Sequence, residues 1–471
     1  MSKRKLIVIG AGPGGYAAAF LAADLGIETM LIDKDVNPGG VCLYRGCIPS
    51  KALLHLAKII SEAEESKNFG VNFSKPKIDL KKIRTWKNDV VSKLTSGLGQ
   101  LSKQRKIEYI QGTATFLDKN SIELTNTKNK KEKIEFEYAI IATGSYPTRI
   151  PALSDSSKNI LDSTTALDLN KIPKTMLVIG GGYIGLELGT VYSALGTKVT
   201  IAEMLPGLLN GADRDLVSVL STKVNKKFES ILLNTKVIDI KEIKTGFKVK
   251  LQSKENKVSE KIYESVLISA GRKPNSSDLG LENAGINISK NGFIITDNQT
   301  RTSVNNIFAI GDVAGEPMLA HKASHEGRVA AEIIAGHKSA FEPKTIPAVV
   351  FTDPEIAWCG ITENEAKEKG LDYTVSKFPW AASGRALTIG RTDGLTKLII
   401  DNKTERILGV GIVGPNAGDL ISEGALAIEM GANATDLKLT IHPHPTLSET
   451  IMESAEVFFG QSTHIYKPKK K

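Results

Sequence analysis

The 471-residue chain contains little cysteine, few aromatic residues and no long apolar run. Its three cysteines argue against a zinc site, which takes four ligands and commonly uses paired Cys-x2-Cys units. Because no apolar run reaches about eighteen residues, we expect nothing to span a membrane. Aromatic residues form 6% of the chain, and the lysines behind its net charge of +9 are scattered, which disfavours a nucleic-acid surface.

The N-terminus superficially resembles a secretory signal, because a basic start precedes the apolar run 6–9. That run breaks at Gly10 and continues into a glycine-rich turn instead of a cleavage site. We therefore interpret the run as the first strand of the fold and expect a cytoplasmic protein. A chain of this length suggests about three domains.

One internal repeat predicts the architecture. Residues 6–15 and 176–185 each read as an apolar strand, a Gly-x-Gly-x-x-Gly turn and the start of a helix. In each copy a second strand ends in an acid, Asp33 or Glu203, 23 residues after the first glycine (33 − 10 and 203 − 180). Glycines with this spacing make the tight turn, the close approach to a pyrophosphate and the helix packing of a dinucleotide-binding fold. They are Gly10, Gly12 and Gly15, then Gly180, Gly182 and Gly185.

The acids also indicate which nucleotide binds. An acid at this place accepts hydrogen bonds from a ribose diol. At Glu203 a carboxylate would repel a 2′-phosphate, and no Arg or Lys lies within the next three residues to accept one. We therefore favour NAD over NADP for the second fold.

The most informative segment is 39–51, which holds Cys42 and Cys47 shortly after the first fingerprint. Residues five apart on a regular helix have Cα atoms about 8–9 Å apart, whereas a disulfide needs less than about 7 Å. We therefore expect a local deformation, permitted by Gly39, Gly40, Gly46 and Pro49. A strained, accessible disulfide is easily reduced and suits a redox couple. A structural bridge is disfavoured in a reducing compartment, while inert thiols stay an alternative.

These motifs resemble the pyridine nucleotide–disulfide oxidoreductases, flavoproteins with tandem dinucleotide folds. The resemblance covers essentially the whole chain and includes 142–144, 270–272, 311–312 and 442–449. Within that family it is closest to the dihydrolipoamide dehydrogenases. Leu447 and Thr450 stand where glutathione reductases typically carry Ser and Glu, and the further cysteine pair of mercuric reductases is absent. Three residues depart from the pattern: Tyr44, Arg45 and Pro443.

The resemblance implies an α/β fold with two tandem Rossmann-like dinucleotide-binding domains plus a C-terminal α+β dimerisation domain. We place an FAD-binding domain at 1–147, an NAD-binding domain at 148–274, the second part of the FAD-binding domain at 275–345 and an interface domain at 346–471. FAD would occupy the first fold and NAD the second. The residues expected at FAD are Gly10, Gly12, Gly15, Asp33, Lys51, Thr143, Gly144, Asp312 and Ala320. Those expected at NAD are Gly180, Gly182, Gly185, Glu203 and Gly271. We expect no metal.

The resemblance also implies catalytic roles. Cys42 would exchange with lipoamide sulfur, and Cys47 would contact the flavin, near Lys51 and its partner Glu187. His444 would be the general base, because a histidine can take a thiol proton near neutral pH and the thiolate is the attacking form. The carboxylate of Glu449 would orient its ring. We interpret His442 as structural.

The implied reaction is oxidation of protein-bound dihydrolipoamide, with hydride passed to NAD+. The expected partners are the lipoyl domains and core acyltransferase of 2-oxo acid dehydrogenase complexes, or the glycine cleavage system. His444 would serve the other subunit of a homodimer, so that each active site is shared. One alternative is another disulfide or mercuric reductase of the same fold. A second is a non-catalytic binding protein on a retained flavoprotein scaffold.

Overall fold

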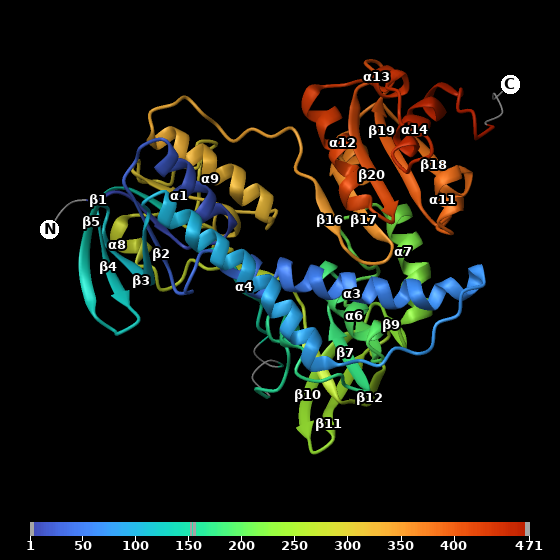
Figure 1. Cartoon of the computed structure of the whole chain (residues 1–471), viewed down its shortest axis with the longest axis horizontal. Coiled ribbons are helices and arrows are strands. Elements are labelled where there is room, and N and C mark those ends of the chain that lie inside the picture. The colour runs from blue at the N-terminus through green and yellow to red at the C-terminus, as the bar shows by residue number, and fades with distance from the viewer. Residues whose placement is uncertain (1–3, 151–152, 154–156, 467–471) are drawn as a thin grey trace.

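The computed structural model describes residues 4–150, 153 and 157–466, and Figure 1 shows them in three lobes. The predicted α/β class is confirmed. The first lobe has a six-stranded sheet whose short apolar strands are buried on both faces, as parallel strands covered by helices require. Its strands are β1 (Arg4–Ile9), β2 (Thr29–Asp33), β3 (Glu108–Asp118), β4 (Ser121–Asn126), β5 (Lys131–Ile141) and β15 (Ile307–Ala309). Because β15 pairs in parallel with β5, the chain returns to this sheet after building the second lobe.

Two helices, α1 (Pro13–Asp24) and α9 (Ala320–Ile334), pack side by side against this sheet (Figure 1). Their close approach depends on glycine. A Cβ atom at Gly14 would lie 2.9 Å from the Ala323 carbonyl oxygen, and one at Gly327 would lie 2.5 Å from the Gly14 carbonyl oxygen. The fingerprint turn and α9 are therefore held in contact through backbone atoms.

The second lobe repeats the strand, glycine turn, helix and strand of the first. Its parallel strands are β7 (Thr175–Ile179), β8 (Lys198–Ala202), β9 (Ser230–Leu232) and β13 (Ser265–Ile268). Helices α6 (Tyr183–Ala194) and α7 (Arg214–Lys227) follow β7 and β8. An antiparallel sheet of β10 (Lys236–Ile243), β11 (Gly246–Gln252) and β12 (Val258–Tyr263) projects from this lobe (Figure 1).

The third lobe contains an antiparallel sheet in the order β16-β17-β20-β19-β18. Its strands are β16 (Ala348–Val350), β17 (Glu355–Gly360), β18 (Tyr373–Pro379), β19 (Leu395–Asp401) and β20 (Ile407–Gly414). Its helices are α10 (Glu363–Glu368), η4 (Trp380–Ala382), α11 (Gly384–Thr388), α12 (Ala417–Met430), α13 (Ala434–Leu439) and α14 (Glu449–Phe459). The α+β composition predicted for the C-terminal domain is therefore confirmed.

Long helices connect the first lobe to the other two. Helix α2 (Gly40–Arg45) leads into α3 (Cys47–Glu65), and α4 (Leu80–Gln104) follows (Figure 1). Leu53 and Leu54 of α3 enter the core of the second lobe beside Leu186 of α6. The shorter elements are η1 (Ser66–Phe69), β6 (Ser145–Pro147), η2 (Thr165–Asp168), β14 (Arg272–Pro274), α8 (Leu281–Ala284) and η3 (Gly311–Val313).

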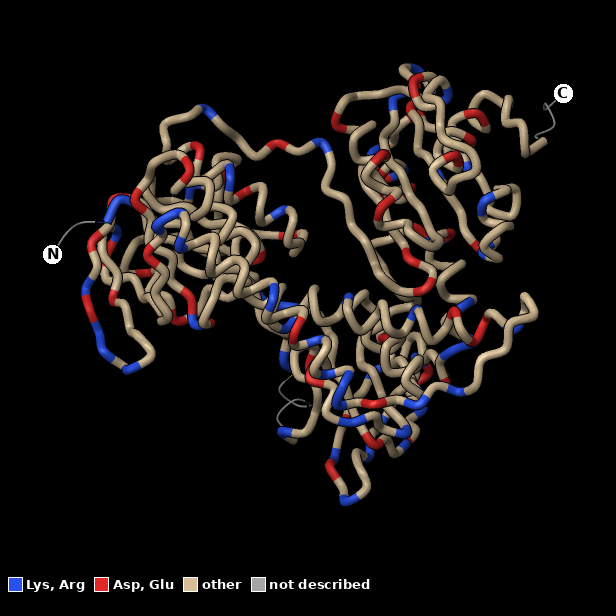
Figure 2. Tube along the Cα trace, in the orientation of Figure 1, with Lys and Arg blue, Asp and Glu red and all other residues tan. Residues whose placement is uncertain are grey.

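Charged residues are spread over all three lobes. Figure 2 shows lysines and arginines interspersed with acids rather than gathered in one stripe, in agreement with the scattered pattern of the sequence. Among the helices of the described residues, none combines the length and the apolar character needed to cross a membrane.

A buried cation fastens the second lobe to the third. Lys397 of β19 has a side chain that is 1% exposed, and its Nζ lies 2.8 Å from Asp213 and 3.1 Å from Asp215, at the start of α7. The same Nζ also pairs with Glu363 of α10. Three carboxylates therefore surround the ammonium group of Lys397. Burial tends to lower the pKa of Lys397, but the carboxylates outweigh burial and the pKa is raised.

We expect Lys397→Met to destabilise the protein by about 3–5 kcal/mol, because it leaves the buried Asp213 carboxylate without its cation, whereas Asp215 and Glu363 keep Lys377. Chemical denaturation followed by circular dichroism measures this effect as a lowered midpoint. Lys403→Met is the matched control, because Lys403 is an exposed lysine of the same lobe. Equal midpoints for the two variants would show that the cluster contributes nothing to stability.

Candidate active site

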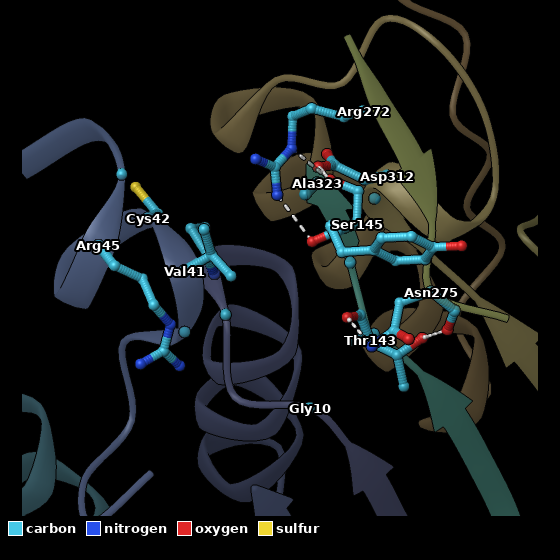
Figure 3. Close-up of a pocket in the computed structure, with 18 of the residues that line it drawn as sticks. Gly10, Val41, Cys42, Arg45, Thr143, Ser145, Arg272, Asn275, Asp312 and Ala323 are labelled. Carbon is cyan, nitrogen blue, oxygen red and sulfur yellow. Dashed lines mark hydrogen bonds between the residues drawn. The ribbon is translucent and has the colours of Figure 1, made fainter. Parts of the chain in front are cut away.

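The first glycine turn, the cysteine segment and β15 meet at one cavity of about 690 Å³. Many of the residues predicted from the sequence line it. They are Gly10, Gly12, Asp33, Cys42, Cys47, Lys51, Thr143, Gly144, Glu187, Asp312 and Ala320. Figure 3 shows Cys42, Val41 and Arg45 on one side of this cavity, and Asp312, Ser145, Thr143, Asn275 and Arg272 on the other.

The turn at the cavity floor is tightly packed. Gly10 has φ +98°, and a Cβ atom there would lie 2.4 Å from the Ala142 carbonyl oxygen. A Cβ atom at Gly15 would lie 1.8 Å from the Gly10 carbonyl oxygen, so Gly15 supports the turn from behind and does not line the cavity. Among the described residues, no atom lies within 4 Å of where a Cβ of Gly12 or Gly144 would stand. These two positions keep the cavity open, which fits the extended pyrophosphate of a dinucleotide such as FAD.

The two acids of the repeat make the same bonds. Asp33 accepts hydrogen bonds from the backbone N–H of Ala11 at 2.6 Å and of Asp35 at 2.9 Å. Glu203 accepts from Gly181 at 2.5 Å and from Leu205 at 2.8 Å. Each acid therefore holds the glycine turn of its own copy. Burial raises the pKa of the Asp33 carboxyl despite these two bonds.

The glycines of the second fingerprint lie at the carboxyl edge of their own sheet and outside the lining of the large cavity, although Tyr183 and Ile184 of the same segment do line it. Gly180 has φ +111°, and a Cβ atom at Gly185 would lie 2.2 Å from the Gly180 carbonyl oxygen. Gly182 caps α6 and has open space beside it, as Gly12 has at α1. Gly271, with φ +96°, lies between β13 and β14. This edge can therefore offer backbone N–H groups of a glycine turn to a second dinucleotide, as the first turn does to the first.

The cysteine segment is deformed as predicted. Helix α2 ends at Arg45, Gly46 adopts φ −142° and ψ −113°, and α3 begins at Cys47. A Cβ atom at Gly46 would lie 2.9 Å from the Val41 carbonyl oxygen. The start of α2 rests on the glycine turn, because Gly39 donates to the Ala11 carbonyl oxygen at 2.8 Å. The pair is thereby fixed against the dinucleotide cavity.

The two thiols are free, and they differ in acidity. A hydrogen bond from the Cys42 thiol is the main cause that lowers the pKa of Cys47 to about 7, and Lys51 contributes against the effect of burial. The same hydrogen bond raises the pKa of Cys42, with burial adding to the rise. As pH rises through about 7 the reduced pair therefore comes to hold a thiolate on Cys47 and keeps its proton on Cys42.

Lys51 is held by a buried carboxylate. Its Nζ lies 2.8 Å from Oε2 of Glu187, whose side chain is 4% exposed. The other oxygen of Glu187 accepts the backbone N–H of Phe351 at 3.0 Å, and the Lys51 ammonium lies 4.6 Å from the centre of the Phe351 ring. The predicted Lys51–Glu187 pair is therefore formed, and the third lobe supports it.

The opposite wall contains a polar network that joins the predicted residues Thr143 and Asp312 to three others, Ser145, Arg272 and Asn275, which the sequence did not predict as site residues. Asp312 accepts the hydroxyl of Ser145 at 2.5 Å, and Arg272 donates to Oγ and to the carbonyl oxygen of Ser145, each at 2.7 Å (Figure 3). Thr143 and Asn275 also exchange hydrogen bonds. The sequence signal for Arg272 and Asn275 is their place just after the buried strand β13, next to residues 270–272 of the family resemblance.

Two departures from the expected cysteine motif have partners in the structure. The Tyr44 hydroxyl donates to the carbonyl oxygen of Asn37 at 3.1 Å, and the backbone N–H of Asn37 donates back to it at 3.2 Å. Arg45 pairs with Asp35, two residues after the first acid of the repeat. Both residues therefore tie α2 to the loop that follows β2.

His444 and Glu449 form a pair away from the cavity. Nδ1 of His444 lies 2.9 Å from Glu449, which also accepts the backbone N–H of Thr446 at 2.8 Å. Burial tends to raise the pKa of Glu449, but the Thr446 bond and His444 outweigh it and the pKa is lowered. The His444 side chain is 74% exposed and does not line the cavity that holds the cysteines of its own chain.

Comparison with known proteins agrees with this geometry. Residues 4–327 match the family described as pyridine nucleotide-disulphide oxidoreductase, and residues 346–455 match its dimerisation domain. The dihydrolipoyl dehydrogenase of Haemophilus influenzae is 47% identical over 469 residues, which cover 100% of this chain and 98% of that protein. The dihydrolipoyl dehydrogenase of Geobacillus stearothermophilus is 47% identical over 98% of this chain and 97% of that protein.

Comparison with solved structures agrees with this family match. LpdA from Mycobacterium tuberculosis superposes with a TM-score of 0.89 at 25% identity, over 97% of this chain and 99% of that one. The flavoprotein disulfide reductase RclA from Escherichia coli superposes with a TM-score of 0.86 at 28% identity, over 97% of this chain and 100% of that one. With two dinucleotide turns, a cysteine pair and full-length relatives, the chain belongs to the pyridine nucleotide-disulphide oxidoreductase family.

Proposed function

We propose that this chain is an NAD-dependent dihydrolipoyl dehydrogenase, which oxidises protein-bound dihydrolipoamide to lipoamide. The observation that carries the proposal is the Cys42–Cys47 pair in the wall of the dinucleotide cavity, next to Lys51. The names of the full-length relatives support the same reaction. We assign the cavity to FAD and the second glycine turn to NAD.

The reaction balances as two thiol–disulfide exchanges followed by electron transfer. A thiolate of dihydrolipoamide attacks the sulfur of Cys42 in the Cys42–Cys47 disulfide, and Cys47 leaves as a thiolate. The second substrate thiol then attacks the mixed disulfide, releasing lipoamide and Cys42. FAD, when bound, supplies a two-electron carrier between the reduced pair and NAD+. His444 takes the substrate proton, and Glu449 holds its ring.

The acidity of the reduced pair supports this division of roles. Cys47 is the first of the two thiols to become negatively charged, at a pKa of about 7, because the Cys42 thiol and the Lys51 ammonium both stabilise its thiolate. Cys42 keeps its proton and takes the role of the exchanging thiol. Lys51 is in turn fixed by Glu187, so its charge stays beside the sulfur.

We further propose a homodimer in which His444 serves the cysteines of the partner subunit. The dimerisation-domain match and the absence of His444 from the lining of its own chain's cavity support this. Large apolar side chains are exposed near the same segment, and Ile441 is 95% exposed. Exposed large apolar side chains on one lobe are consistent with a protein–protein interface. Here they are Leu426, Met430, Leu439 and Ile441.

The proposed partners of the dimer are the lipoyl domains and the core acyltransferase of 2-oxo acid dehydrogenase complexes or of glycine cleavage. We propose the cytoplasm as the location, because a cysteine pair that must cycle suits a reducing compartment. An alternative is another disulfide or mercuric reductase of this fold, which the substrate assay distinguishes.

We expect purified FAD-loaded protein to oxidise dihydrolipoamide rapidly with NAD and slowly with NADP, because Glu203 repels a 2′-phosphate. Formation of reduced nicotinamide under anaerobic conditions measures both rates. Glu203→Ala should lower kcat/KM for NAD by about tenfold, since it removes a charged hydrogen-bond partner of the ribose. Fast turnover of glutathione disulfide or Hg(II) with no reaction of dihydrolipoamide would contradict the proposed substrate.

Cys42→Ala should raise the pKa of Cys47 above about 7, because the Cys42 thiol is the main group that lowers it. The pH dependence of the alkylation rate in reduced protein gives this pKa. Cys359→Ala is the matched control, since burial raises the pKa of Cys359 to about 12 and it lies outside the cavity lining. An unchanged Cys47 pKa in Cys42→Ala would mean that the two thiols do not interact.

His444→Gln should retain FAD and lose roughly 10²–10⁴-fold in dihydrolipoamide turnover, because the base is missing. Mixing it with Cys42→Ala tests the shared site. A heterodimer of these two inactive variants regains one complete site only if each base serves the other subunit. Co-expression with two different affinity tags isolates that heterodimer. Activity no higher than in either parent variant would show that base and cysteines come from one chain.

A further inference from the structure

His442 differs from the residues around it because its side chain is buried. Ile441, Pro443, His444 and Pro445 are all exposed, whereas the His442 side chain is 5% exposed. Its ring packs between this segment and α12, where it meets Glu423. The exposed segment that holds the proposed base is therefore anchored by the residue two positions before that base.

Both ring nitrogens of His442 face acceptors. Nδ1 lies 2.9 Å from the carbonyl oxygen of Thr440, and Nε2 lies 2.7 Å from Oε1 of Glu423. A carbonyl oxygen has no proton to give, and an ionised carboxylate has none either. Both nitrogens must therefore carry hydrogen if both contacts are hydrogen bonds, which makes the ring an imidazolium.

We propose that His442 is the positioning residue of His444, and that it acts as an imidazolium that ties the segment carrying the base to α12. The inference rests on the proposed role of His444 as the base. At the other end of the segment, Glu449 holds Thr446 and His444 itself. The base is thus fixed between two anchors, and each of them depends on a glutamate.

The electrostatics around His442 favour the charged ring. The hydrogen bond to Glu423 is the largest cause that raises the pKa of His442, burial opposes it, and the Thr440 carbonyl adds to the rise. The acidic groups that act on the ring are Glu423 from α12 and Glu449 at the start of α14. Because the pKa is raised, the ring keeps its charge to a higher pH than a free histidine and loses it only as pH rises through the raised value.

The test separates positioning from general damage by measuring two half-reactions of the FAD-loaded dimer. Reduction of the enzyme by dihydrolipoamide needs the base, whereas reduction by NADH does not. His442→Asn should slow the first by about 10–100-fold, because a small displacement of the base has this cost. The NADH half-reaction should keep its wild-type rate. Equal slowing of both half-reactions would overturn the proposal.

Glu423→Gln tests the charge of the ring. An amide holds the imidazolium less strongly, so the variant should resemble wild type at mildly acidic pH. The rate at which dihydrolipoamide reduces this variant should decline with rising pH. That decline should begin at a lower pH than in the wild type. Asp419→Asn is the matched control, because Asp419 is an exposed acid on the same helix. A pH profile identical to that of the control would contradict the proposal.

Nuclear magnetic resonance of histidine-labelled protein gives readouts that need no substrate. The His442 signals should report a doubly protonated ring at mildly alkaline pH, and the His444 signals should shift in His442→Asn but not in Asp419→Asn. A neutral His442 ring, or unmoved His444 signals, would overturn the inference. If dihydrolipoamide fails to reduce the wild-type enzyme, the proposed function fails, while these spectra still decide the charge of His442 and its effect on His444.

Discussion

The contact on which the active site depends is the carboxylate of Glu187. One of its oxygens holds Lys51 of α3, and the other accepts the backbone N–H of Phe351 from the third lobe. Glu187 itself lies on α6 of the second lobe. A buried carboxylate is tolerated only when its charge and its lone pairs are compensated. Here the compensation comes from two other parts of the chain, so the three lobes are held together at the point where Lys51 approaches Cys47.

Much of this arrangement could be predicted because it is local in the sequence. The glycine turns, the acids at their fixed spacing and the helix after each turn depend on neighbours within about one strand–helix unit, so the repeat was sufficient to place them. The break at Gly46 followed from the geometry of two cysteines five residues apart. His444 and Glu449 are also close in sequence, and their contact is present.

The rest could not be predicted because the partners are far apart in the chain. Ser145, Arg272 and Asp312 form one network, yet no spacing rule connects them. The three acids around Lys397 come from separate segments and look like ordinary surface charges in the sequence. The acids of the repeat were expected to bind ribose. The sequence did not predict that they accept hydrogen bonds from backbone N–H groups of their own glycine turns. His442 was interpreted as structural, and only the geometry of its two acceptors indicates a charge.

The interruption at Gly46 also makes two chemically identical residues unequal. Because α3 begins at Cys47, that sulfur lies at the first turn of a nineteen-residue helix, whose aligned peptide dipoles present partial positive charge there. A thiolate at such an end is stabilised, whereas Cys42 lies in the first turn of a helix of only six residues, which has fewer aligned peptide dipoles. The break at Gly46 therefore acts in the same direction as the Cys42 hydrogen bond and the Lys51 ammonium, which lower the pKa of Cys47. A single residue without a side chain thereby helps to make the two sulfurs different.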